Sequence, residues 1–202
     1  MRYDLSVIAS WVEPCARVLD LGCGRGDLLA HLREHKQAVA RGIEISEDKA
    51  EEAIARGLSV LHGDLTAEIE DYPDQSFDYV ILSQTLQQVY EPGRIIREML
   101  RVGKCGIVSF PNFSHWGIRL QLLLTGVAPV SRELPYGWHD TPNIRVITLK
   151  DFRRFCRKEG FAVEREVAIS THHHEERGRR VRLLPNLLAT YGIFLLSRKA
   201  SA

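Results

Sequence analysis

Three glycines at alternate positions, Gly22, Gly24 and Gly26, stand in the segment DLGCGRG together with an acid, Asp20. Glycine weakens regular structure, so such a cluster indicates a sharp turn or a close approach of the backbone to a ligand. The cluster follows an apolar run and precedes an amphipathic segment, and open parallel sheets hold their ligands at such strand-to-helix turns. Its G-x-G-x-G spacing differs from the dinucleotide fingerprint G-x-G-x-x-G, which disfavours a nicotinamide cofactor. A tight turn without a ligand is the alternative.

Two further acids end the next two apolar runs. Glu44, in GIEIS, follows Gly22 by 22 positions, close to the interval at which an acid typically meets a ribose diol. Asp64, in LHGDL, can accept a hydrogen bond from the exocyclic amine of an adenine. Each acid has a plainer explanation, Glu44 as a solvated acid before a helix and Asp64 as a helix N-cap. Three consecutive strand ends with a polar candidate favour the ligand interpretation.

The elements that must position these residues alternate along the first half of the chain. Short apolar runs predict strands at 17–21, 40–45, 59–62, 77–83 and 106–110. Amphipathic segments predict helices at 26–36, 47–56 and 94–102. The strands are nearly continuous apolar runs, as expected when helices cover both faces of a sheet. The alternation predicts an α/β, Rossmann-like, doubly wound fold with a mostly parallel sheet.

The second half departs from this rhythm. Residues 111–148 form a long excursion that contains four prolines, and such a segment in a compact domain is usually a lid or a binding surface. A helix predicted at 149–160 and two strands predicted at 162–170 and 191–198 follow; the two strands could close the sheet as an antiparallel pair. We therefore expect one domain over residues 1–202, with an insert at about 111–148 and a seven-stranded sheet whose last strand is antiparallel.

Composition narrows the function classes. Lys and Arg number 27 against 26 for Asp and Glu, so no strong field favours nucleic acid or an anionic membrane as a partner. The four cysteines form no C-x-x-C pair, and the adjacent histidines at 172–174 point in different directions, so we expect neither a metal site nor a disulfide framework. Without a signal-like segment or a membrane-length apolar run, the expected location is the cytoplasm.

The set VLDLGCGRG, IEIS, HGDL and FDYVILSQTLQQV resembles the S-adenosylmethionine-binding core of class I methyltransferases over about residues 15–110. The resemblance implies that Asp20 and the glycine turn hold the methionine end of S-adenosylmethionine or S-adenosylhomocysteine. It also implies that Glu44 binds the ribose. The implied cofactor-binding residues are Asp20, Gly22, Cys23, Gly24, Gly26, Glu44, Ile45, Asp64, Leu65, Ser83 and Gln84. Asp64 and Leu65 would lie at the adenine side, and Ser83 and Gln84 near the sulfonium.

Longer segments carry the resemblance further. ILSQTLQQVYEP, EMLRVGKCGIVSFPNFSHWGIRLQLLLTG and LPYGWHDTPNIRVITLKDF are similar to the methionine-biosynthesis MetW family, and the similarity runs from residue 1 to about residue 161. It implies an S-adenosylmethionine-binding, methyltransferase-like protein of methionine biosynthesis that acts with or on a homoserine O-acyltransferase. It does not imply a reaction.

Gln87 and Gln88 bear on whether the chain is a catalyst. Many small-molecule methyltransferases of this fold carry an acid–His pair at this point, and glutamine cannot take a proton. The pair therefore favours a partner subunit. The alternative is an active S-adenosylmethionine-dependent small-molecule methyltransferase with the insert as its substrate lid, in which His139 and Asp140 are a base and its orienting acid.

The insert also contains candidates for a docking surface. Trp116, Tyr136 and Trp138 belong to a residue class that is enriched at interface hot spots. A short helix is predicted for FSHWGIRLQLLL, and the spacing of its leucines at 120, 123 and 124 is typical of a buried helix face. We therefore expect these leucines in the core and the aromatic side chains, if any, at a partner surface.

Overall fold

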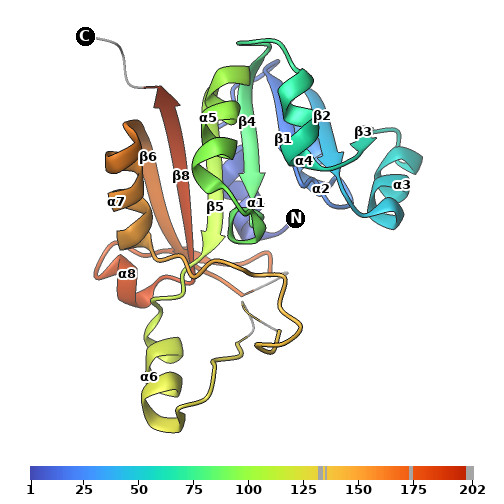
Figure 1. The fold of residues 1–202 in the computed structure, drawn as a ribbon. Helices are drawn as coiled ribbons and strands as arrows, with labels where there is room; N and C mark the ends of the chain where they lie inside the picture. Colours follow the sequence, from blue (N-terminus) through green and yellow to red (C-terminus); the bar gives the residue numbers. More distant parts are fainter. Residues whose placement is uncertain (132–133, 135, 173–174, 199–202) are drawn as a thin grey trace.

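The computed structural model describes residues 1–131, 134, 136–172 and 175–198; the histidines at 173 and 174 lie outside this set. One sheet of eight strands organises the chain, in the order β3-β2-β1-β4-β5-β8-β6-β7 (Figure 1). The strands are β1 (Arg17–Leu21), β2 (Val39–Glu44), β3 (Ser59–His62), β4 (Phe77–Ser83), β5 (Gly103–Pro111), β6 (Phe161–Ser170), β7 (Arg179–Arg180) and β8 (Tyr191–Arg198). The order reverses between β1 and β4, which makes the sheet doubly wound.

Strands β1 to β5 are parallel, and β8 lies antiparallel between β5 and β6. The predicted α/β fold and the antiparallel pairing of the last two long strands are therefore confirmed. The structure adds an eighth strand to the predicted seven, because Arg179 and Arg180 pair with Ile169 and Ser170 at the sheet edge. A two-residue, exposed, basic strand has no apolar periodicity, which is the signal on which strand prediction depends.

Helices cover both faces of the sheet (Figure 1). The α-helices are α1 (Tyr3–Ala9), α2 (Asp27–Lys36), α3 (Glu47–Ala55), α4 (Leu65–Glu68), α5 (Pro92–Val102), α6 (Trp116–Thr125), α7 (Leu149–Glu159) and α8 (Pro185–Leu188). Two 3₁₀ turns, η1 (Ile69–Asp71) and η2 (Leu86–Gln88), complete the set. The helices α1 and α2 share one apolar cluster with the sheet, and α5 and α7 share another.

Strand β1 illustrates why its apolar run is continuous. Successive residues of a strand point to opposite faces. Val18 packs in the cluster of α1 and α2, whereas Leu19 and Leu21 pack in the cluster of α5 and α7, and all three are fully buried. With a helix layer on each side, the buried positions of the strand need apolar side chains except where a residue serves the site, as Asp20 does; Arg17, at the start of the strand, is exposed.

The insert leaves β5 at the carboxyl edge of the parallel strands, and α6 projects away from the sheet (Figure 1). None of the ten described residues of α6 is buried, so the expectation that Leu120, Leu123 and Leu124 belong to the core is wrong. Their spacing is that of a buried face, but the helix projects from the sheet and leaves these three leucines exposed. No helix in the described part of the chain is long and apolar enough to cross a membrane.

The insert returns to the sheet through two sets of backbone hydrogen bonds. The Phe113 amide donates to the Ile147 carbonyl at 3.1 Å. The amides of Ile144 and Arg145 both donate to the carbonyl of Gln87 at 3.0 Å. Residues 143–147 are thereby held beside η2, which follows the end of β4.

Candidate functional site

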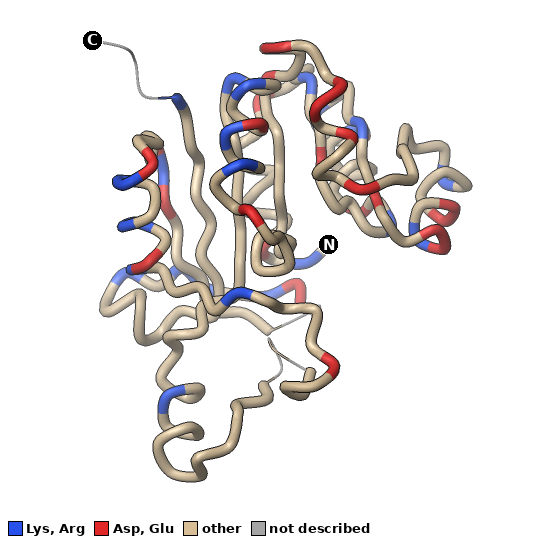
Figure 2. Tube along the Cα trace, viewed as in Figure 1, with Lys and Arg blue, Asp and Glu red and all other residues tan. Residues whose placement is uncertain are grey.

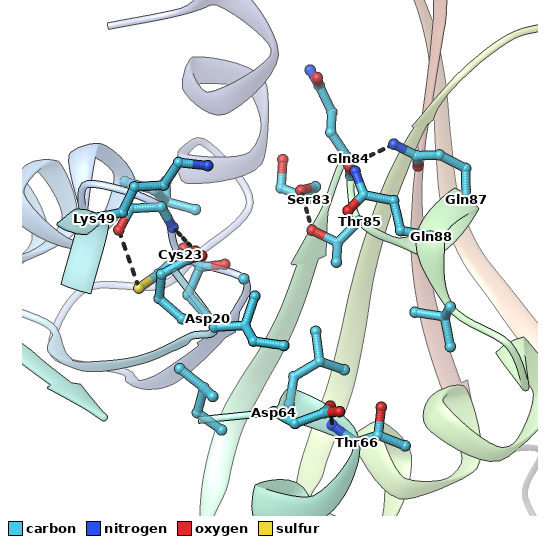
Figure 3. A pocket seen from close by; sticks show the side chains of 18 of the residues that line it. Asp20, Cys23, Lys49, Asp64, Thr66, Ser83, Gln84, Thr85, Gln87 and Gln88 are labelled. Atoms are coloured by element: carbon cyan, nitrogen blue, oxygen red, sulfur yellow. Dashed lines mark hydrogen bonds between the residues drawn. The ribbon is translucent and has the colours of Figure 1, made fainter. Parts of the chain in front are cut away.

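A cavity of about 820 Å³ opens at the carboxyl ends of β1, β2, β3 and β4. Ten of the eleven residues predicted to bind a cofactor line it: Asp20, Gly22, Cys23, Gly24, Glu44, Ile45, Asp64, Leu65, Ser83 and Gln84. Figure 3 shows Asp20 and Cys23 on one side, Asp64 on another and Gln84 across from them. The four strand ends meet here because the strands are parallel and adjacent in the sheet.

Any residue other than glycine would strain the backbone of the glycine turn, residues 22–26. Gly22, Gly24 and Gly26 have φ angles of +74°, +57° and +77°, a region that side chains rarely adopt. A Cβ on Gly22 would lie 2.8 Å from the Thr85 hydroxyl, so the turn also packs tightly against the end of β4. Gly26 does not belong to the lining set; it begins α2, and a Cβ there would lie 2.3 Å from Leu58 Cδ1.

Glu44 holds the glycine turn in place. The amide of Gly24 donates to Glu44 Oε2 at 2.7 Å, and the amide of Ser46 donates to Oε1 at 2.9 Å. The carboxylate is buried while it lines the cavity. Each carboxylate oxygen has a second lone pair, so both can still accept a hydrogen bond from a ligand. The structure thus assigns Glu44 a backbone-positioning role that its spacing alone does not reveal.

Asp20 is a buried acid with an unused oxygen. Its side chain is 3% exposed, and Oδ1 has no hydrogen-bond partner among the described residues. Burial raises the pKa of Asp20 to about 7; the Arg2 guanidinium opposes this rise, and the Glu44 carboxylate adds to it. An acid of this kind is stabilised in its charged form by a cation that enters the cavity.

The N-terminal segment closes one side of the cavity. Arg2 and Leu5 line it, and Arg2 contacts the buried carboxylate of Asp4 through Nε at 3.2 Å and Nη2 at 3.0 Å. Gln84, whose φ is +53°, donates from Nε2 to Asp4 Oδ2 at 2.5 Å. The segment is therefore tied to the end of β4. Its part in the site was not predicted, since no local pattern links residue 2 to the glycine turn.

The side of the cavity near β2 and β3 combines an acid with apolar side chains. Asp64 caps α4, because its Oδ1 accepts from the Thr66 amide at 2.8 Å, and it also lines the cavity. Asp64 is therefore a helix N-cap and a residue of the cavity lining at the same time. Ile45 lines the same side although its large apolar side chain is 68% exposed. An exposed apolar side chain of this kind can pack against a flat aromatic ring.

The opposite end of the cavity is formed by η2 and the insert. Gln87 and Gln88 lie across the cavity from Asp20 and Cys23 (Figure 3), and the bonds from Ile144 and Arg145 to the Gln87 carbonyl bring Asn143 beside them. Tyr90 and, from the insert, Tyr136 also belong to the lining. The lid candidates His139 and Asp140 are exposed, and the His115 ring nitrogen Nδ1 accepts from the Gly117 amide as the N-cap of α6. Tyr136 is thus the predicted insert residue that the fold brings to the cavity. Asn143 was missed because its position depends on the return of the insert to Gln87.

The sheet order and the cavity at its switch point define the class of the protein: it has the fold of the S-adenosylmethionine-dependent methyltransferases. A methyltransferase of Thermotoga maritima, described as a possible histamine N-methyltransferase, superposes with a TM-score of 0.70 and 22% identity, over 98% of this chain and 88% of its own. Magnesium protoporphyrin IX methyltransferase from Synechocystis, solved with bound S-adenosylmethionine, superposes with a TM-score of 0.57 and 17% identity, over 97% and 78%. At these identities the likeness shows the fold.

The match to a protein family is more specific than the likeness in fold. A family model described as methionine biosynthesis protein MetW matches residues 2–196, and the chain belongs to the MetW family. The bifunctional methionine biosynthesis protein MetXA/MetW of Rhodopirellula baltica is 36% identical over 176 residues, which cover 83% of this chain. The matched segment spans 28% of the length of that relative.

Proposed function

We propose that this chain binds S-adenosylmethionine or S-adenosylhomocysteine at the glycine turn and acts in methionine biosynthesis as the partner of a homoserine O-acyltransferase. The observation that carries the first part is the unpartnered Oδ1 of Asp20, buried beside Arg2 and Glu44 in a cavity of about 820 Å³. The second part is supported by the MetW family and by the relative whose name joins MetXA and MetW in one protein.

The cavity residues fit each part of the cofactor. The α-ammonium group would donate to Asp20, which lacks a donor among the described residues, and Arg2 would supply a positive charge for the carboxylate. The ribose hydroxyls would donate to the remaining lone pairs of Glu44. Ile45 and Leu65 would flank the adenine, and Asp64, which also lines the cavity, would accept from its amine.

The residues near η2 favour a partner over a catalyst. When bound, S-adenosylmethionine supplies an electrophilic methyl group, whose transfer needs alignment and, for many acceptors, a base. Gln87 and Gln88 occupy this part of the lining, and an amide cannot take a proton. Binding of the cofactor without transfer would let the protein report the supply of a downstream product to the acyltransferase.

An apolar surface on the insert supports the partner. We define the insert patch as Trp116, Leu122, Leu123, Leu124, Val127 and Trp138, all of which are exposed. In α6 the charged residue is Arg119, and the tube over this helix is almost entirely free of charge (Figure 2). Exposed apolar patches of this kind mark sites of protein association.

Two measurements test the proposal. Calorimetric titration with S-adenosylmethionine and with S-adenosylhomocysteine is expected to give binding by the free chain. Co-purification with the acyltransferase is expected to fall at least about tenfold for Leu123→Ser, because a hot-spot contact contributes about 2 kcal/mol. Leu183→Ser is the matched control, since Leu183 is 74% exposed and Leu123 80%, and Leu183 lies outside the insert.

The outcomes separate the two parts of the proposal. Equal recovery of the acyltransferase by Leu123→Ser and Leu183→Ser would remove the insert patch as the docking surface. Failure of both cofactors to bind the free chain and the complex would remove the cofactor site. Transfer of a methyl group from S-adenosylmethionine to a small molecule by the free chain would establish the alternative, an active methyltransferase.

A further inference from the structure

Two buried oxygen atoms at the insert end of the cavity lack hydrogen-bond donors. They are Oε1 of Gln87 and Oδ1 of Asn143, and neither has a partner among the described residues. The Gln87 side chain is 4% exposed, and both residues line the cavity. A buried acceptor without a donor is costly, and native structures keep such groups where they serve a ligand or bound water.

Hydrogen bonds to Gln87 hold the residues that carry these oxygens. Gln87 Nε2 donates to the Gln84 carbonyl at 2.6 Å, so its amide nitrogen is occupied and its oxygen is left over (Figure 3). The backbone carbonyl of the same residue accepts from Ile144 and Arg145 at 3.0 Å. These two bonds hold the residue before them, Asn143, next to η2. The two oxygens therefore belong to one end of the cavity and come from two different elements.

The chemistry of the pair selects a ligand that donates. Amide oxygens accept hydrogen bonds and cannot supply them, and two oxygens require two hydrogens on the ligand. A single hydroxyl brings one hydrogen, whereas a primary amine brings at least two and an ammonium group three. We propose that this end of the cavity binds a small primary amine as a second ligand beside the cofactor. Tyr90 and Tyr136, which also line the cavity, would contact the body of that molecule.

This second site differs from the cofactor site in its elements. The ammonium of the cofactor has its own acceptor in Asp20, at the end of β1, whereas Gln87 follows β4 and Asn143 belongs to the insert. The inference therefore goes beyond the proposed function, because it adds a small-molecule ligand to the proposed cofactor and the proposed protein partner. An amine bound there would contact the insert directly and would couple its occupancy to the segment that carries the insert patch.

The test uses the full chain saturated with S-adenosylhomocysteine. Ethanolamine, L-serine and L-homoserine are titrated by calorimetry, each beside its N-trimethylated counterpart, which keeps the rest of the molecule and lacks N–H hydrogens. We expect at least one amine to bind and its trimethylated counterpart to bind at least about tenfold more weakly. Asn143→Ala should weaken the amine about tenfold, and Asn143→Asp should strengthen it, since a carboxylate accepts from an ammonium more strongly.

Controls keep the result specific. Gln121→Leu removes an amide from α6, outside the cavity lining, and should leave amine binding unchanged. Gln87→Leu should abolish amine binding; because it also removes the bond to Gln84, the Asn143 variants decide the matter if it fails to fold. The inference is overturned if no amine binds at about 10 mM, or if each trimethylated compound binds as well as its amine.

A third result would also overturn it. If Asn143→Ala weakens S-adenosylhomocysteine instead of the amine, the two oxygens serve the cofactor. Binding of S-adenosylhomocysteine without binding of any amine refutes this inference and leaves the proposed function intact.

Discussion

The ionisation of Asp20 should control how tightly the cofactor binds as a function of pH. Because burial raises the pKa of this acid to about 7, the free protein holds it mostly protonated at about pH 6 and mostly ionised at about pH 7.5. A bound ammonium favours the ionised form. The cofactor must therefore displace a proton at the lower pH, and its affinity should rise as the pH rises toward and through the pKa of the free acid.

The magnitude follows from the shift. For a group with a pKa of about 7 that must be ionised to bind, affinity rises about eightfold between about pH 6 and about pH 7.5. The α-amino group of S-adenosylhomocysteine is that of a free amino acid, which stays an ammonium ion over this interval, so the expected gain remains about eightfold. Asp20→Asn removes the ionisation of the acid, so its affinity should be nearly constant over the same interval.

The assay is calorimetric titration with S-adenosylhomocysteine at both pH values, in two buffers of different ionisation enthalpy, so that protons released on binding are counted. Asp20→Asn should weaken binding at least about tenfold at the higher pH, because it replaces the charged acceptor of the ammonium by a neutral amide oxygen. Thermal unfolding of the variant is the control for folding. If the natural protein binds equally at both pH values and releases no proton, or if Asp20→Asn keeps the eightfold rise, Asp20 does not receive the ammonium.

Other variants test the remaining contacts. Glu44→Ala should weaken the binding of S-adenosylhomocysteine at least about tenfold and lower the melting temperature, because the carboxylate also anchors the glycine turn. The control Glu47→Ala, at the exposed start of α3, should change neither quantity. A lower melting temperature for Glu44→Ala without a change in affinity would show that Glu44 does not bind the ribose. Arg2→Ala should move the rise in affinity to higher pH, because Arg2 lowers the pKa of Asp20; an unmoved profile would contradict that coupling. Under the proposed partnership, Leu123→Ser should reduce co-purification with the acyltransferase, whereas Leu183→Ser should not.

Local patterns in the sequence were sufficient to predict the parallel core and the part of the cavity lining formed by the strand ends. Asp20 and Glu44 could be found because each lies at or next to the carboxyl end of a predicted strand, and parallel strands bring their carboxyl ends to one edge. The same logic does not reach Arg2 or Asn143. These residues enter the cavity through contacts between distant segments, the bond from Gln84 to Asp4 and the bonds from the insert to Gln87.

The side chains of the site were also only partly predictable. That Glu44 accepts from the Gly24 and Ser46 amides depends on the path of the loop, which residue types do not specify. The leucines of α6 follow a spacing that usually means burial, and the error arises because periodicity reports an apolar face but not what covers it. Such a face can be covered by the same chain or by another one.

The exposure of α6 has a consequence for the turnover of the protein in the cell. A ten-residue helix with no buried residue gains little from packing and is marginal in water, so α6 in the free chain should unravel often and offer its leucines to chaperones and proteases. Under the proposed partnership with the acyltransferase, copies in excess of that enzyme would be removed first, and selective turnover would keep the amounts of the two proteins matched. A single polypeptide that contained both the acyltransferase and this chain would have equal amounts of the two from its synthesis.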